Sequence, residues 1–300
     1  MTAQEDGARV RVTRPAVQVD LAAARKSDTP FYEPEVWSPG GKHILHVQPA
    51  QLPLRGVDDG KPGRVEVLTY NGKLVGPTIR VRRGERFTVR VVNDLQGPEP
   101  FAKVYSNLPA GSPVDPKDPE RKQIDPPHGL YTTNLHTHGL HVSPVGKADD
   151  VFVEIAPGKS RDFVYQVPAD HPAGTFWYHP HKHGSVGYQL ASGMAGALIV
   201  EGDPAAGFTD LEAVPAIAAA KERVFVLQQL ALRVAPQGIG WVYPDDVYNG
   251  EDNATPDKPD GILKLPGQPA YQTTTVNGVV MPTVRLRPGE VQRWRFVHAG

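Results

Sequence analysis

The sequence contains no cysteine among its 300 residues. This absence excludes disulfide bonds, zinc–thiolate and iron–sulfur sites, and cysteine nucleophiles. The net charge is also small, at −1, with 32 Lys and Arg against 33 Asp and Glu. Without an excess of positive charge the chain has no field that would hold a phosphate backbone. Nucleic acid is therefore a poor candidate partner.

Long hydrophobic runs are missing as well. The longest uncharged stretch, residues 184–200, is interrupted by two serines, a glutamine and four glycines. It is too short and too polar to span a membrane. The first eleven residues carry two acidic and two basic side chains, and no apolar segment follows them. The start does not have the pattern of a secretory signal, so the sequence predicts no membrane span and assigns no compartment.

Glycine and proline are abundant, with 30 and 31 residues. Both disfavour helix interiors, so the composition argues against a helical bundle. Hydrophobic residues make up 39% of the chain, enough to build a core. Apolar and polar residues alternate in several short stretches, which is the period-two pattern of half-buried strands. We predict an all-β sandwich with strands at residues 43–48, 64–70, 79–82, 87–91, 133–138, 151–155, 163–167, 175–179, 197–201, 223–230 and 291–297.

Two proline-containing stretches interrupt this rhythm and suggest a division of the chain. Residues 94–130 hold eight prolines and are predicted to be a long surface insertion. Residues 203–221 have the composition of a linker with at most one turn of helix. The predicted organisation is a leader over 1–42, a first domain over 43–202 that contains the insertion, the linker over 203–221, and a second domain over 222–300.

An internal repeat supports two related domains. Residues 77–85 (Pro-Thr-Ile-Arg-Val-Arg-Arg-Gly-Glu) recur at 282–290 (Pro-Thr-Val-Arg-Leu-Arg-Pro-Gly-Glu), with six of nine positions identical. An Asn-Gly pair precedes each copy, and an alternating stretch follows each. Duplication explains this agreement of order, spacing and flanks better than a common β-turn composition does. Only ten residues follow the second copy, so we expect the second domain to be truncated in this chain.

Seven of the eleven histidines lie between positions 136 and 183. His136 and His138 form a His-x-His pair, and His179 and His181 repeat it 43 residues later. On a strand, residues i and i+2 point to the same face about 7 Å apart, so two pairs on separate strands can converge on one centre. Imidazoles without thiolate favour copper, zinc, iron or nickel. We predict that these four histidines are metal ligands.

Other polar residues in this region fit simpler roles. His141 could extend the first pair to the His-x-His-x-x-His pattern of a zinc metallohydrolase. Those enzymes normally place a carboxylate beside the last histidine, however, and a leucine stands there. We predict that His183 and His128 are solvated or lie behind the ligands. By themselves, Asp149 and Asp150 are typical of a solvated turn.

Four linked motifs resemble those of laccase-type multicopper oxidases. In chain order they are Asn-Gly at 71–72 with residues 76–80 and 84–85, Asn-Leu-His-Thr-His-Gly at 134–139, Gly-Thr-Phe-Trp-Tyr-His-Pro-His at 174–181, and Gly-Met-Ala-Gly at 193–196. The resemblance is strong over residues 43–202 and weaker over 223–300. It implies cupredoxin-like Greek-key β-sandwiches, one complete and a second incomplete.

The resemblance also implies copper. By position, His136 matches the ligand of a type 2 copper. Three further histidines match ligands of the binuclear type 3 pair, namely His138, His179 and His181. They would form half of a trinuclear cluster. Asp149, or less closely Asp150, lies near the position where the family keeps an acidic residue that assists proton delivery to dioxygen.

The departures from the family pattern are equally specific. Family members take four more cluster histidines from the final domain, and they carry a blue type 1 copper site with one Cys and two His ligands. Here there is no Cys, and His298 is the one histidine after His183. We therefore expect this chain to lack the type 1 site, to need C-terminal cupredoxin domains as partners, and not to turn over by itself.

These observations predict a laccase-like oxidase that oxidises a small phenolic or metal-ion donor and reduces dioxygen to water. Three alternatives stay open: a non-catalytic cupredoxin-repeat scaffold, a copper carrier, and a metallohydrolase that uses His136, His138 and His141. Four retained histidines argue against the scaffold. The β-repeat argues against the hydrolase. Copper stoichiometry and redox behaviour would separate the carrier from the oxidase.

Overall fold

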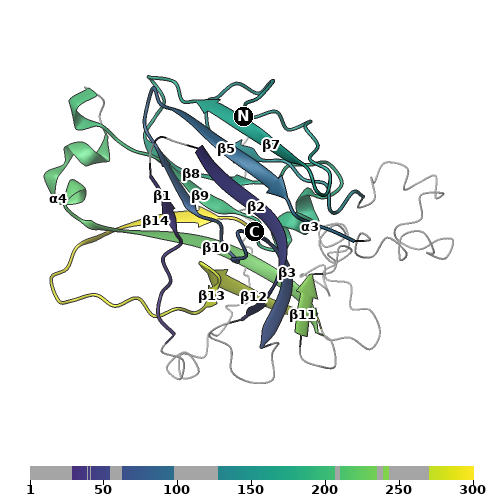
Figure 1. Ribbon diagram of the computed structural model, residues 1–300. Helices are drawn as coiled ribbons and strands as arrows, with labels where there is room; N and C mark the ends of the chain where they lie inside the picture. The colour runs from purple at the N-terminus through teal and green to yellow at the C-terminus, as the bar shows by residue number, and fades with distance from the viewer. Residues whose placement is uncertain are drawn as a thin grey trace, which may run out of the picture.

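In a computed structural model, the described residues are 29–38, 40, 42–54, 63–97, 128–206, 210–234, 239–242 and 270–300. They form two β-sheets with a few short helices (Figure 1). The strands are β1 (Val36–Trp37), β2 (Lys42–Pro53), β3 (Arg64–Tyr70), β4 (Thr78–Val81), β5 (Arg86–Asn93), β6 (His136–His138), β7 (Ser160–Gln166), β8 (Gly174–His179), β9 (Gly196–Val200), β10 (Lys221–Val234), β11 (Ile239–Val242), β12 (Ala270–Val276), β13 (Val279–Val280) and β14 (Gln292–His298). The helical turns are α3 (Val186–Ala191), η1 (Pro204–Ala206), η2 (Leu211–Ala213) and α4 (Pro215–Ala218). Among the helices of these residues, none has the length and apolar character of a membrane span.

The two sheets face each other across a common core. One has five strands in the order β1-β4-β9-β8-β6. The other has nine, in the order β13-β12-β10-β11-β3-β2-β5-β7, with β14 paired to β10. Side chains alternate as expected in β5, where every second residue is buried. The predicted all-β sandwich is therefore confirmed.

One of the predicted strands is wrong. Residues 151–155 form a turn, in which Phe152 N–H donates to Asp150 Oδ1 at 3.1 Å. Ile155 keeps a single bridge to Thr133. The second copy of the repeat also differs from the first, since it forms no strand equivalent to β4: Thr283 makes a single bridge to Pro30, and residues 284–290 pair with no strand among the described residues. A β-like sequence becomes a strand only where a neighbour pairs with it.

Strand β9 is buried along its whole length. Leu198 and Val200 face the core between the two sheets. Ala197 and Ile199 face a second apolar cluster with Val224 of β10 and its neighbours. A strand covered on both faces needs apolar residues at every position, which accounts for the uncharged sequence Gly-Ala-Leu-Ile-Val. Residues of the predicted first and second domains thus share one apolar cluster.

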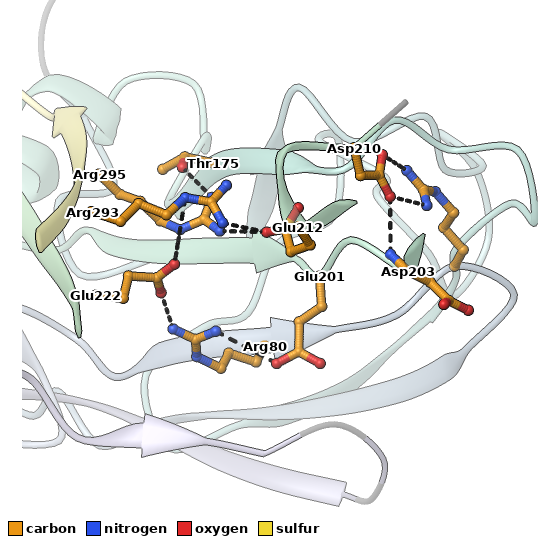
Figure 2. A network of polar contacts seen from close by, with 10 residues as sticks. Arg80, Thr175, Glu201, Asp203, Asp210, Glu212, Glu222, Arg293 and Arg295 are labelled. Atoms are coloured by element: carbon orange, nitrogen blue, oxygen red, sulfur yellow. Dashed lines mark hydrogen bonds and ion pairs between the residues drawn. The ribbon is translucent and has the colours of Figure 1, made fainter. Parts of the chain in front are cut away.

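A network of ion pairs connects β4, β8, β10 and β14 near this second cluster (Figure 2). Arg295 of β14 is 6% exposed; it donates to Glu222 at 2.5 Å, to Glu212 at 3.3 Å and to Thr175 Oγ1 at 3.0 Å. Arg80 of β4 also donates to Glu222. Burial alone would raise the pKa of Glu222, but the contacts with both arginines hold that pKa below its ordinary value. The network ties strands from distant parts of the sequence.

The predicted domain boundaries remain a prediction, and the structure adds three facts to them. Residues 203–221 contain η1, η2 and α4, which lie to one side of the sheets (Figure 1). Within the predicted leader, β1 pairs with β4. Strand β11 pairs in parallel with β3, so one sheet crosses the predicted boundary. Most of the predicted insertion lies outside the described residues.

Candidate metal centre

The two His-x-His pairs meet because β6 and β8 are neighbouring antiparallel strands. Their register places His136 opposite His179 and His138 opposite Trp177. Thr137, between the two histidines of β6, is 2% exposed and faces the other side of the sheet. Alternation along the strand therefore puts both imidazoles of β6 on one face, as the spacing predicts.

All four predicted histidines lie together. The ring of His136 is 5.6, 5.3 and 5.0 Å from the rings of His138, His179 and His181, between centroids. The ring of His179 is 5.5 Å from that of His138 and 5.9 Å from that of His181. One nitrogen each from His136, His138 and His179 lies within 4.8 Å of the others, a grouping that could hold a metal ion.

Hydrogen bonds fix which ring nitrogens face the centre. His136 donates from Nδ1 to the Asp149 carboxylate at 2.8 Å, and His179 donates from Nδ1 to the Pro180 carbonyl at 2.8 Å. Each ring therefore keeps Nε2 as a lone-pair donor. His138 Nδ1 lies 3.3 Å from His179 Nε2. Since His179 Nε2 carries no proton, the His138 tautomer protonated at Nδ1 would donate to it, and a metal ion bound at these nitrogens would take the place of that proton.

Burial favours the neutral form of two of these imidazoles, His138 and His179. It lowers the pKa of His179 to about 4, and the neighbouring His136, His138 and His181 act in the same direction. Burial, followed by His136 and His181, also lowers the pKa of His138. Metal ions bind neutral imidazole, so His138 and His179 are in their metal-binding form at pH 7. The donor set of neutral imidazoles suits copper or zinc and does not suit magnesium or calcium.

Two aromatic residues of β8 support the cluster from different sides. The Trp177 indole stacks on His179 at 4.2 Å and on His138 at 4.9 Å, between centroids. Tyr178 points into the core and donates its hydroxyl to the Pro77 carbonyl at 2.7 Å. Trp177 thus restricts the ring planes of His138 and His179, while Tyr178 anchors β8 to the core.

Asp149 lies behind the cluster and contacts one of its members. Its two carboxylate oxygens accept separate hydrogen bonds, one from His136 Nδ1 and one from Thr137 N–H at 2.8 Å. Asp149 is 8% exposed. Asp150, the weaker of the two candidates, caps the next turn and has no hydrogen bond to a cluster histidine among the described contacts.

Sequence reasoning missed two buried amides that hold the site. Asn134 accepts from His181 N–H at 2.6 Å and donates to the Val151 carbonyl at 2.7 Å. Gln189 of α3 accepts from the Thr133 hydroxyl at 2.8 Å. Asn134 stands inside a motif that the sequence displays, but its partners are 47 and 17 residues away, so spacing carries no signal for these bonds.

The other histidines lie outside the cluster. His141 N–H donates to Nε2 of the buried His171 at 3.0 Å, and their rings are 4.8 Å apart. The rings of His128 and His183 contact each other at 5.6 Å. The group of candidate ligands found in the described residues contains neither His141 nor His181, but the His181 ring contacts those of His136 and His179, whereas His141 contacts His171. The geometry therefore gives no support to a zinc site of His136, His138 and His141.

His171 should make stability depend on pH. Burial chiefly lowers its pKa below the ordinary 6.5, with His141 and Arg83 in the same direction and the Pro172 carbonyl and Asp170 opposed. The unfolded chain then binds more protons than the folded chain, so stability falls as pH drops below about 6.5. The free energy of unfolding should depend less steeply on pH in His171→Gln, by up to about 1.4 kcal/mol per pH unit. Urea unfolding of both proteins from pH 7.5 to 5 measures it; equal slopes would contradict the assignment.

Sandwich and cluster together define a cupredoxin-like protein with a candidate metal centre made of histidines. Solved structures share this fold: a multicopper oxidase from *Aquifex aeolicus* matches 91% of this chain and 46% of its own, at a TM-score of 0.57 and 18% identity. A laccase from *Pediococcus acidilactici* matches 85% of this chain and 42% of its own, at a TM-score of 0.54 and 18% identity. These likenesses confirm the predicted Greek-key cupredoxin fold.

Sequence comparison points to the same class of proteins. Residues 55–102 and 129–205 match the family model described as multicopper oxidase. A multicopper oxidase of *Staphylococcus aureus* is 28% identical over 137 residues, or 45% of this chain and 22% of its own length. A laccase of *Bacillus stratosphericus* is 27% identical over 245 residues, or 78% and 41%. These matches support the multicopper oxidase class for the matched part of this chain, and the chain spans less than half the length of these relatives.

Proposed function

We propose that this chain supplies half of the copper cluster of a laccase-like multicopper oxidase. His136 would hold the type 2 copper, and His138, His179 and His181 would hold the type 3 pair. The observation that carries the proposal is the pairing of β6 with β8, which brings His136, His138 and His179 together, with the His181 ring 5.0 Å from that of His136. Copper held there would pass single electrons from a phenolic or metal-ion donor to dioxygen, which is reduced to water.

The chain's own residues would prepare this site in three ways. Asp149 orients His136, the Pro180 carbonyl orients His179, and Trp177 fixes two ring planes by stacking. Such contacts behind metal ligands raise their basicity and hold their tautomers. His138 and His181 are exposed, so dioxygen and a covering histidine-bearing domain could reach the open side of the cluster.

The test is to load the purified chain with Cu(II), record its optical spectrum and assay a phenolic donor under air. We expect copper binding without an intense thiolate-to-copper band, since the chain has no Cys. We expect oxygen-coupled turnover once a C-terminal part with Cys and His ligands is supplied. Turnover by the chain alone, well above that of free copper, would refute the division of the site. Failure to bind copper would refute the proposal.

Asp149 is proposed to deliver protons to dioxygen as well as to orient His136. In a complete oxidase, Asp149→Asn should slow reoxidation by dioxygen about 10²–10⁴-fold, the usual contribution of a general acid. The two carboxylate oxygens of Asp149 accept from His136 and from Thr137, whereas an amide has one acceptor oxygen. The variant therefore loses one of these two hydrogen bonds, and copper affinity should also fall, by about 10-fold. Asp150→Asn is the matched control and should change neither. Stopped-flow reoxidation that is unchanged in Asp149→Asn would remove the proton role.

A copper carrier is the second candidate, because two of the four imidazoles are open to solvent. A carrier would bind one copper and release it to a chelator without oxygen-dependent redox change. Copper stoichiometry after supplying the C-terminal part separates the two functions: more than one clustered copper supports the oxidase, and a single exchangeable copper supports the carrier.

A further inference from the structure

Asn134 joins the two halves of the histidine cluster. It is fully buried, at 0% exposure, and lies two residues before His136. Its carbonyl oxygen accepts the backbone N–H of His181 at 2.6 Å, and its amide donates to the Val151 carbonyl at 2.7 Å. One side chain therefore connects the segment that leads into β6, the turn that carries the second His pair, and the loop that carries Asp149.

His181 needs such a contact because it lies beyond the end of β8. The β6–β8 ladder fixes His179 opposite His136, but it stops there. Pro180 follows, and proline has no N–H with which to extend a ladder. The His181 ring is on the exposed side of the cluster. Among the described contacts, the bond to Asn134 holds the His181 backbone against the strand that carries the first pair.

The segment around Asn134 is itself held firmly. Gln189 of α3 accepts from Thr133 Oγ1 at 2.8 Å and donates to the Leu130 and Thr132 carbonyls at 2.9 and 2.8 Å. Ser185 donates to the same Thr132 carbonyl at 2.9 Å. Both of these residues follow His181 in the chain. Asn134 therefore follows a segment whose backbone and side chains are held by hydrogen bonds from Gln189 and Ser185.

We propose that Asn134 is a positioning residue that sets His181 as the fourth imidazole of the metal cluster. This inference rests on the proposed copper function and deepens it. Asn134 contacts no metal and no substrate, and it acts through the backbone of His181. Its carbonyl oxygen is the group that matters for His181, whereas its amide ties down the loop at Val151.

The test measures Cu(II) affinity of the full chain by competition with a chelator, together with the electron paramagnetic resonance of the bound Cu(II). Asn134→Leu keeps the side-chain shape but loses the acceptor; it should weaken binding at least 10-fold and remove one nitrogen coupling. Asn134→Asp keeps an acceptor for His181 N–H and should stay within about threefold of the parent chain. Asn134→Leu with unchanged affinity and spectrum would overturn the proposal.

Asn93→Leu is the matched control. Asn93 is also fully buried, and its amide donates to the Tyr131 and Ile155 carbonyls at 2.7 and 2.8 Å, but it contacts no cluster histidine. Its loss should lower the thermal midpoint as Asn134→Leu does while copper affinity stays within about threefold. Equal losses of copper affinity in the two variants would reduce Asn134 to a structural role. Should Asn134→Leu not fold, Asn134→Ser, too short to span both contacts, replaces it under the same criteria.

A double-mutant cycle with His181→Ala identifies the route of the effect. If Asn134 acts through His181, Asn134→Leu adds no further loss of affinity in the His181→Ala background. Additive losses would overturn the proposal. Copper binding that survives both His136→Ala and His179→Ala would refute the proposed function and this inference together. Loss in those variants without loss in Asn134→Leu would refute this inference alone.

Discussion

His179→Ala should lower the Cu(II) affinity of the chain by more than about 100-fold, beyond the 10–100-fold typical of losing a contact behind a ligand. His179 is the most buried member of the cluster, at 5% exposure, and its ring contacts those of His136, His138 and His181. Removing it takes away one nitrogen of the 3.3 Å pair with His138. Isothermal titration with Cu(II) at pH 7.5 measures the change.

Two control variants make this result interpretable. His43→Ala removes a histidine that stacks on Trp37, away from the cluster, and should leave copper affinity unchanged. His141→Ala is the discriminating variant, because a metallohydrolase-type site would use it and the observed cluster does not. If His141→Ala costs as much affinity as His179→Ala, the ligand assignment is wrong.

Arg295→Met should lower the free energy of unfolding by about 3 kcal/mol, because it leaves two half-buried carboxylates without one of their cations. Arg295 is 6% exposed, and the side chains of its partners Glu212 and Glu222 are each 20% exposed. Arg80 and Arg293 remain beside them, which places the loss at the low end for a broken buried pair. Urea unfolding followed by tryptophan fluorescence measures it.

Arg82→Met provides the comparison for this second prediction. Arg82 pairs with Glu201 at 3.1 Å, but its side chain is 69% exposed. An exposed pair of this kind contributes roughly 0–1 kcal/mol. A loss for Arg295→Met no larger than that for Arg82→Met would show that burial of the network adds nothing to stability.

Strand prediction succeeded where alternation and a pairing partner coincide. Residues 64–70 form β3 as predicted, and residues 87–91 and 163–167 fall largely within β5 and β7. It failed at residues 151–155, where the Val151 carbonyl is taken by Asn134 and the Phe152 N–H by Asp150. Side-chain amides and carboxylates there compete with a β-ladder for the same backbone groups. Helix α3 was not predicted from the sequence. Two of its residues, Tyr188 and Gln189, are buried against other segments of the chain, and local periodicity does not reveal such contacts.

The sequence by itself determined the all-β class, the resemblance to multicopper oxidases, and the four histidines as a candidate metal set. These depend on residue type and on local spacing: alternation fixes which side chains share a face, and His-x-His puts two imidazoles on one side of a strand. These properties are local: they depend on a few consecutive residues and not on contacts between distant segments.

Only the tertiary structure decided how the site is held. The register of β6 against β8 sets His136 opposite His179, Asp149 reaches back to His136 across 13 positions, and Asn134 bonds His181 across 47. The six identical positions of the repeat likewise did not yield a second β4, because that segment has no described neighbour beyond the bridge at Thr283. Hydrogen bonds between distant segments depend on where the chain brings them, and that is a property of the whole fold rather than of any local pattern.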